Sequence, residues 1–265
     1  MNISVIQLGR VDYATALRLQ QTLVDLRKAG EVGDVLLLLE HTPVITLGRN
    51  ARAQHVVASP EVLAAKGVEL YECDRGGDVT YHGPGQLVGY PIFDLRGFTP
   101  RIGAVEFVRR LEDVLIRTCA DFAIAAERVQ GLTGVWTEES PQTHRATEPR
   151  RAKIAAIGVH ISRGVTSHGL ALNVATDLDY FNLIVPCGIA DKPMTSMARE
   201  LEANGGEAPP LDEVAESVAR NFGRVFNRPI AWVDTLDALL GRRVGVPMRP
   251  PRELREMFDD ESFRA

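Results

Sequence analysis

Two segments of the sequence, Lys153-Ile-Ala-Ala-Ile-Gly-Val-His160 and Ser167-His-Gly-Leu-Ala-Leu-Asn-Val174, alternate large and small side chains. A period of two is typical of β-strands, so we expect two strands here. The small residues of each segment share one face, which leaves room for another group to pack there or for a backbone to approach closely. Further on, Val185-Pro-Cys-Gly188 is expected to hold its cysteine at a defined place, because proline fixes φ and glycine lets the chain turn.

Lys153 and Cys187, at the two ends of this region, are the first candidates for chemistry. A nucleophilic cysteine reacts as the thiolate, and a nearby ammonium would favour that form of a thiol whose ordinary pKa is roughly 8.5. Taken singly, a lone cytosolic cysteine is more often a buried small residue, and a lysine at a strand edge is usually solvated. Cys73 and Cys119 fit structural roles. These residues alone indicate a possible cysteine enzyme.

The composition is that of an ordinary globular protein. The chain has 265 residues, of which 45% are hydrophobic and 25% charged, and its net charge of −5 argues against a general nucleic-acid binder. No apolar run approaches the roughly 20 residues of a membrane span, and the first residues lack the pattern of a secretory signal. Three widely spaced cysteines fit a reducing compartment, so we expect a cytoplasmic protein with neither nucleic acid nor membrane as a partner.

A second informative segment reads Arg75-Gly-Gly-Asp-Val-Thr-Tyr-His-Gly-Pro-Gly-Gln86. Its paired glycines could cradle an anion through backbone N–H groups, but the lysine of a phosphate-binding loop is missing. His82 and His168 each stand beside glycine, and neither matches the spacing of a zinc site, so no metal site is predicted. The Gly83–Gly85 step predicts a tight turn and, with the apolar segments on both sides, a hairpin.

Hydrophobic periodicity predicts helices over residues 12–29, 102–122, 211–226 and 236–240, and a short helix opening at Ser59 and Pro60. Strands are predicted over residues 3–8, 35–39, 68–72, 87–95, 134–137 and 230–233. Strands cluster while helices occur singly, which indicates an α+β fold with mixed or antiparallel sheets packed against helices.

Four segments together, 75–86, 153–159, 168–174 and 186–188, resemble the octanoyltransferase family, the lipoyl(octanoyl) transferases of lipoate biosynthesis. They occur in that family's order, and the resemblance covers roughly residues 5–226. It implies the fold of the catalytic domain of biotin and lipoate protein ligases. Residues 1–241 are then expected to form the catalytic domain and residues 242–265 a charged, flexible tail.

The resemblance also implies a reaction and its partners. The family moves an octanoyl group from octanoyl-acyl carrier protein to one lysine of a lipoyl domain, either in a 2-oxoacid dehydrogenase or in the glycine cleavage H protein. Cys187 would attack the thioester and become octanoylated, while Lys153 would lower the thiol pKa and later accept a proton from the amine. A thioester already carries the activation energy, so no cofactor is expected.

The positions that correspond to the family's acyl-binding residues are Arg75, Gly76, Gly77, Asp78, Val79, Thr80, Tyr81, His82, Ala156, Ile157, Gly158, Gly169, Leu170 and Ala171. For the tetrahedral oxyanion we expect a donor in the backbone N–H after Cys187 or in His82. Docking of acidic partners would need a basic patch, for which the candidates are Arg49, Arg52, Arg150, Arg151 and Arg163.

Three other functions fit parts of the pattern. An ATP-dependent lipoate–protein ligase shares the implied fold but would not need Cys187. A cysteine-dependent amidotransferase would pass octanoyl between lipoyl-domain proteins. A binding module for acyl carrier or lipoyl domains would have no use for a lysine and cysteine pair.

Overall fold

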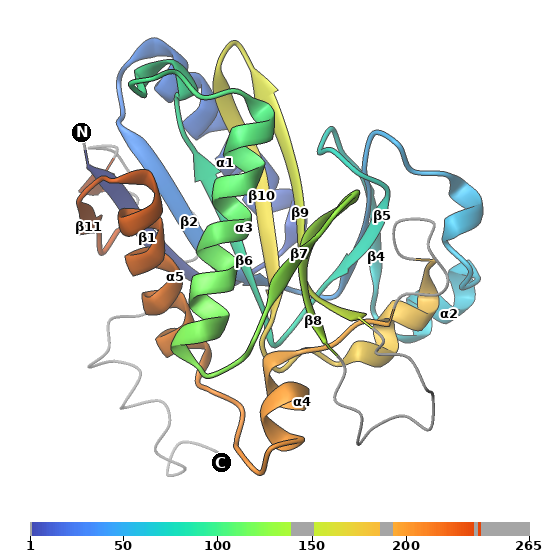
Figure 1. Ribbon diagram of the computed structural model, residues 1–265. Coiled ribbons are helices and arrows are strands. Elements are labelled where there is room, and N and C mark those ends of the chain that lie inside the picture. The colour runs from blue at the N-terminus through green and yellow to red at the C-terminus, as the bar shows by residue number, and fades with distance from the viewer. Residues whose placement is uncertain (1, 139–150, 186–192, 236–237, 240–265) are drawn as a thin grey trace, which may run out of the picture.

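The computed structural model describes residues 2–138, 151–185, 193–235 and 238–239. In these residues an eight-stranded sheet runs in the order β11-β1-β2-β6-β10-β9-β8-β7 (Figure 1). Its strands are β1 (Ile3–Val11), β2 (Asp34–His41), β6 (Gln86–Ile92), β7 (Glu127–Val129), β8 (Leu132–Glu138), β9 (Arg151–Ser162), β10 (Val165–Asn173) and β11 (Ile230–Trp232). Strand β1 is parallel to β2 and β11, whereas the other pairs are antiparallel. The sheet is therefore mixed, as predicted.

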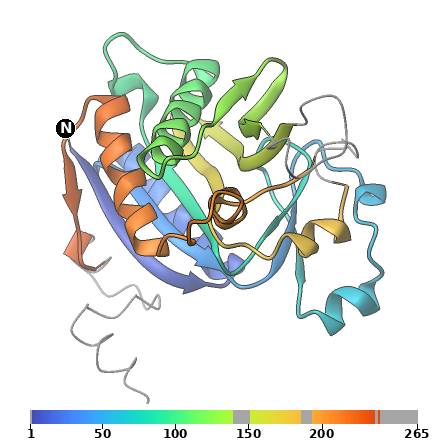
Figure 2. The same ribbon diagram turned by 60° about the horizontal axis from the view of Figure 1, so that its bottom comes forward.

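Helices cover both faces of this sheet (Figures 1 and 2). Helices α3 (Ala104–Asp121) and α5 (Leu211–Phe226) pack on one face around Phe107 and Phe222, and α1 (Tyr13–Ala29) packs on the other. The predicted helix ends are confirmed in α1, where Asp12 accepts a hydrogen bond from the Thr15 amide and Gly30 ends the helix in the left-handed conformation. A short helix, α4 (Met197–Glu202), was not predicted.

A second, smaller sheet lies beside the first and has the order β4-β3-β5. It contains β3 (Val44–Leu47), β4 (Glu69–Glu72) and β5 (Val79–His82), with α2 (Pro60–Ala65) nearby. Ser59 and Pro60 open α2 as predicted. The sheet has its own apolar cluster, which includes Ile45 and Phe181. The two sheets together form the walls of the candidate site.

The predicted hairpin around Gly83–Gly85 is wrong, although the turn is present. Strand β5 pairs with β3 in the small sheet, whereas β6 pairs with β2 and β10 in the large one. A side chain at Gly85 would overlap the Ala175 backbone, and the φ of 78° there also favours glycine. The turn is thus held against the large sheet, and it moves the chain from one sheet to the other.

A buried ionic cluster ties the elements together at one end of the sheet. The carboxylate of Asp34, fully buried on β2, accepts hydrogen bonds from Arg27 Nε at 2.9 Å, from Arg228 and from the Asp94 amide. It therefore links α1, β2 and the segment that connects α5 to β11. Buried carboxylates of this kind need their cations, because an unpaired charge in the interior is strongly unfavourable.

The helix predicted at 236–240 lies largely outside the described residues, and the tail 242–265 lies entirely outside them. None of the helices in the part of the chain that the structure describes combines the length and the hydropathy required to cross a membrane.

Candidate active site

A narrow slot of about 50 Å³ lies between β9, β10 and the loop at residues 75–78. It opens into a cavity of about 580 Å³, and the two spaces share Lys153, Ile157 and Gly158. The slot is lined by all the predicted acyl-binding residues except Tyr81, and also by Lys153, Tyr13, Val88, Tyr90 and His168. The structure therefore gathers three segments that are far apart in the sequence around one space.

Tyr81 faces away from the slot. Its ring stacks on Tyr180 with centroids 4.8 Å apart and meets Phe181 edge-on, within the core of the small sheet. Neighbouring side chains on a strand point to opposite faces, so Thr80 and His82 line the slot while Tyr81 packs behind it.

Arg75 holds the loop against both sheets. Its guanidinium is buried and donates to the Thr46 carbonyl at 2.7 Å, to the Thr46 hydroxyl and to the Gly76 carbonyl. A side chain at Gly158 would lie 2.6 Å from the Gly76 carbonyl oxygen, and one at Gly169 would overlap the Gly89 carbonyl. Glycine is therefore required at positions 158 and 169 because the backbones at Gly76 and Gly89 approach them closely.

Lys153 is positioned by β8. Its Nζ lies 5.1 Å from the centroid of the Trp136 ring, and its Cε and Nζ occupy the space that a side chain at Gly134 would need. The register of β8 and β9 shifts between Val135 and Trp136, which places Trp136 directly opposite Lys153. On the other side of β9, the Lys153 backbone bonds to Pro193 and Thr195. The lysine thus projects from a strand that is fixed on both edges.

A chain of hydrogen bonds fixes the orientation of the buried His82 ring. The Thr195 carbonyl can only accept, so Asn173 donates to it from Nδ2 and its Oδ1 accepts from Gln86 Nε2. Gln86 Nε2 also donates to the Tyr81 carbonyl, which leaves Gln86 Oε1 as the acceptor 2.7 Å from His82 Nδ1. His82 therefore carries its proton on Nδ1.

The neutral form of His82 follows from its surroundings. Burial, with the neighbouring His41 and Arg75, lowers the pKa of His82 to about 3. A neutral imidazole protonated at Nδ1 presents a lone pair at Nε2, and in the described residues no group bonds to that atom. His82 is thus an acceptor, which disfavours the expected role as an oxyanion donor.

Tyr90 lines the slot together with His82, and His41 contacts both of these rings without lining the slot itself. These three residues form the polar floor beneath the slot. His41 Nδ1 lies 2.8 Å from the Val11 carbonyl and must donate to it, so His41 Nε2 accepts from the Tyr90 hydroxyl at 2.7 Å. Burial lowers the pKa of His41 to about 4 and raises that of Tyr90. The rings of Tyr13 and His82 are nearly parallel. This floor is uncharged at neutral pH.

His168 forms a separate contact at the far wall. It has a φ of 55°, its amide donates to the Gln20 side-chain oxygen at 2.8 Å, and its Nε2 lies 2.7 Å from Asp74 Oδ1. Asp74 also lies 3.5 Å from His160. Burial would raise the pKa of Asp74, but the hydrogen bond from His168 and the charges of both histidines hold it below its ordinary value.

Cys187 lies outside the described residues, and so does Arg150. The flanks of the cysteine segment are described: the Val185 amide donates to the His55 carbonyl at 2.7 Å, and the Lys153 amide donates to the Pro193 carbonyl at 2.9 Å. Among the other candidates for a basic patch, Arg151 forms an ion pair with Glu127 at 2.7 Å.

Five residues at or beside the site were not predicted from the sequence, namely Gly134, Trp136, Tyr13, His41 and Asn173. For Gly134 a signal was present, because an isolated glycine within a strand pattern often marks a bulge or a close approach. For the others no local pattern exists, since each reaches the site only through tertiary contacts.

Comparison with known proteins identifies the family of this chain. Residues 12–223 match the lipoyl protein ligase A/B catalytic domain, and the octanoyltransferase of Koribacter versatilis is 60% identical over 98% of each chain. The chain belongs to the octanoyltransferase family. The octanoyltransferase of Acidobacterium capsulatum is 54% identical and covers 91% of this chain and 96% of its own. Membership of this family makes the chain an acyltransferase, as predicted.

Solved structures show the same fold at low sequence identity. A lipoate-protein ligase A bound with ATP matches with a TM-score of 0.69 and 14% identity, over 98% of this chain and 95% of its own. A putative lipoate protein ligase of T. acidophilum with bound lipoic acid matches with a TM-score of 0.62 and 13% identity, covering 88% of this chain and 89% of its own. The predicted lipoate-ligase-like fold is confirmed.

Proposed function

We propose that this chain transfers an octanoyl group from octanoyl-acyl carrier protein to a lysine of a lipoyl domain, through a thioester on Cys187. The observation that carries the proposal is the slot beside Lys153, because it joins the three predicted acyl-binding segments to the predicted base. Family membership supports the octanoyl group and the lipoyl acceptor. The acceptors are the lipoyl domains of 2-oxoacid dehydrogenases and the glycine cleavage H protein.

In the first half-reaction the Cys187 thiolate attacks the carbonyl carbon of the donor thioester. The new carbon–sulfur bond forms as the bond to the carrier's sulfur breaks, and the carrier leaves as a thiol by taking a proton from the Lys153 ammonium. Lys153 is then neutral for the second half-reaction. The ammonium of Lys153 favours the Cys187 thiolate before attack. Support for this pairing comes from the Pro193 and Thr195 hydrogen bonds, which fasten one flank of the cysteine segment to Lys153.

In the second half-reaction the acceptor amine attacks the acyl-cysteine. An amide bond forms, the Cys187 thiolate leaves, and the amine loses a proton to Lys153 in its neutral form. Both half-reactions use the same acyl group in the same slot, so the carrier and the lipoyl domain bind in turn. The fixed backbone around Lys153 keeps the base in place through both steps.

The octanoyl chain binds in the slot and in the cavity into which the slot opens. Each buried CH₂ contributes about 0.8 kcal/mol, so an eight-carbon chain supplies several kcal/mol of affinity. His82 and Tyr90, which line the slot, are uncharged at neutral pH and therefore place no charge against the chain on that side. His82 Nε2 offers a hydrogen-bond acceptor to an N–H group of a substrate.

Intact mass spectrometry tests the proposal. Incubation with octanoyl-acyl carrier protein should add one octanoyl group to the chain, and a purified lipoyl domain should then remove it without ATP. Cys187→Ser should show no thioester adduct, and Lys153→Ala should form the adduct slowly, with a higher pH optimum for Cys187 alkylation. A requirement for ATP with free octanoate would instead identify a ligase, and binding without any adduct would identify a binding module.

A further inference from the structure

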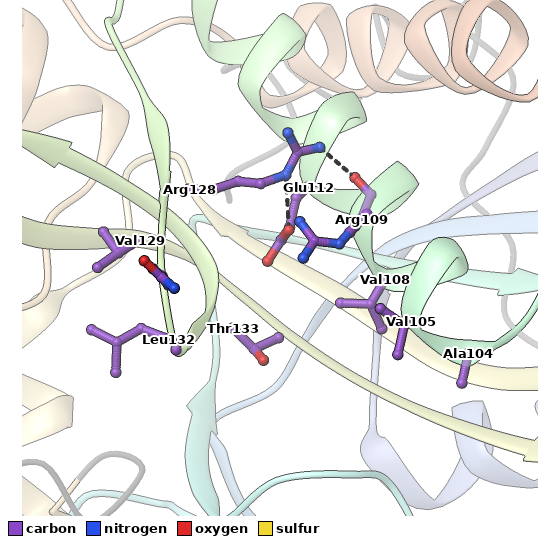
Figure 3. Close-up of a pocket in the computed structure, with 11 residues that line it drawn as sticks. Ala104, Val105, Val108, Arg109, Glu112, Arg128, Val129, Leu132 and Thr133 are labelled. Atoms are coloured by element: carbon purple, nitrogen blue, oxygen red, sulfur yellow. Dashed lines mark hydrogen bonds and ion pairs between the residues drawn. The ribbon is translucent and has the colours of Figure 1, made fainter.

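A surface groove beside the β7–β8 hairpin leads toward Lys153. It lies between the first half of α3 and the β7–β8 hairpin, and has a volume of about 720 Å³ (Figure 3). Apolar side chains face one another across it, namely Ala104, Val105 and Val108 from α3 and Val129 and Leu132 from the hairpin. Val105 is 70% exposed, so the groove is open to solvent at this residue.

This groove is continuous with the candidate active site. It shares Val108, Gly131, Leu132 and Thr133 with the 580 Å³ cavity, and that cavity reaches Trp136 and Lys153. A path lined by these residues therefore runs from the surface to the predicted base. Both volumes fall within the roughly 300–1,000 Å³ that is typical of small-molecule sites.

Among the described residues, Arg109 is a cation of the groove for which the structure gives no carboxylate partner. Arg128 is neutralised by Glu112 at 2.9 Å and by Asp113, and it also donates to the Arg109 carbonyl (Figure 3). The Arg109 side chain, in contrast, forms no ion pair within the described residues. Arg109 lines the groove but not the inner cavity, so the free charge lies away from Lys153.

An occupant that fits is therefore long, largely uncharged and anionic at the end remote from Lys153. The phosphopantetheine arm of an acyl carrier protein has this chemistry: a thioester at one end, amide and dimethyl groups in the middle, and a phosphate at the other end. We propose that the groove binds this arm, with the dimethyl group between Val105 and Leu132 and the phosphate at Arg109. The proposal rests on the proposed function, since it takes octanoyl-acyl carrier protein as the donor.

Three octanoyl thioesters test the phosphate contact. Arg109→Ala should lower kcat/KM about tenfold for octanoyl-acyl carrier protein and for octanoyl-phosphopantetheine, but should leave octanoyl-pantetheine, which lacks the phosphate, unchanged. The tenfold difference should shrink as ionic strength rises. Arg117→Ala removes an equal charge from an exposed position of the same helix outside the groove, so it should not distinguish the three donors.

Val105→Trp tests the apolar part of the groove. Val105 is exposed, so the variant should fold, which the thermal midpoint verifies. The larger ring should raise KM for all three pantetheine donors and leave octanoyl-N-acetylcysteamine, which ends before the dimethyl group, unaffected. Transfer from the short thioester also shows that the chemistry is intact, so failure of every donor would count against the proposed function and not against the groove alone.

Several results would overturn the assignment. If Arg109→Ala lowered kcat/KM equally for octanoyl-phosphopantetheine and octanoyl-pantetheine, a contact between Arg109 and the phosphate would be ruled out. A loss restricted to the intact carrier protein would place Arg109 against the carrier's surface instead of its arm. A loss confined to lipoyl-domain acylation would indicate that the groove binds the acceptor. A change in the oligomeric state of Val105→Trp would indicate that the groove binds a second copy of the chain.

Discussion

The Nζ atom of Lys153 lies 5.1 Å from the centroid of the Trp136 ring, and the two residues are paired across the ladder of β8 and β9. The bulge before Trp136 brings Gly134 against the same lysine side chain. Strand β8 thus forms a cradle for the Lys153 side chain, made of the Gly134 backbone, which has no side chain, and the face of the Trp136 ring. The position of the predicted base depends on this strand, which carries no titratable group at either contact.

Gly134→Ala should reduce acyl transfer about a hundredfold, because displacement of a catalytic group by roughly 1 Å has an effect of that size. The new Cβ would lie 2.6 Å from Lys153 Cε, and the φ of 117° would add strain. The rate of octanoyl adduct formation measures the effect. Gly67→Ala is the matched control, since Gly67 has a φ of 62° but no atom within 4 Å of the added Cβ. Equal losses in both variants would contradict the cradle.

Trp136→Phe should retain more activity than Trp136→Leu. A benzene ring can still face the ammonium, whereas leucine loses an attraction of about 0.5–2 kcal/mol. The pH dependence of Cys187 alkylation with iodoacetamide measures how strongly Lys153 lowers the pKa of the Cys187 thiol. If the leucine and phenylalanine variants share one pH profile, then the ring face has no part in placing the charge.

Stability should fall as the pH is lowered from about 6.5 toward 4. His41 and His82 have pKa values of about 4 and about 3 in the fold, against an ordinary value of 6.5, so the unfolded chain binds more protons in this range. Each histidine then lowers the free energy of unfolding by up to about 1.4 kcal/mol per pH unit. Urea unfolding at pH 7, 6, 5 and 4.5 measures the slope.

The contribution of these two histidines is isolated by His41→Gln/His82→Gln. This variant cannot take up the two protons, so its free energy of unfolding should change less steeply with pH than that of the unaltered chain. Other acid-sensitive groups are common to both proteins and cancel in the comparison. Identical slopes would mean that the two imidazoles are not held neutral.

Asp34→Asn should destabilise the fold by about 3–5 kcal/mol, because it removes the fully buried carboxylate that pairs with Arg27 and Arg228 and leaves Arg27 with the longer contact to Asp94, at 3.9 Å. Urea unfolding at neutral pH measures the change. Glu106→Gln breaks the exposed ion pair with Arg110, one turn along α3, and should cost less than about 0.5 kcal/mol. A similar small value for both variants would show that the Asp34 cluster is not a buried ionic network.

Local sequence patterns were enough to locate most of the secondary structure. The alternation after Lys153 gave β9 and β10, and the apolar periodicity beginning at Asp12 gave the extent of α1. Motifs in four segments identified the family, and three of these segments contain most of the residues that line the slot. These features depend on neighbours within a few residues, or on patterns that the family shares, so they can be read from the chain itself.

Tertiary structure decided where those elements meet. The turn at Gly83–Gly85 joins two sheets because β5 finds its partner in β3, which lies far away in the sequence. The Nδ1 proton of His82 is set by a relay that ends at the Thr195 carbonyl, and the place of Lys153 is set by Gly134 and Trp136. No local pattern encodes such contacts, because they depend on side chains that come together only when distant strands pack.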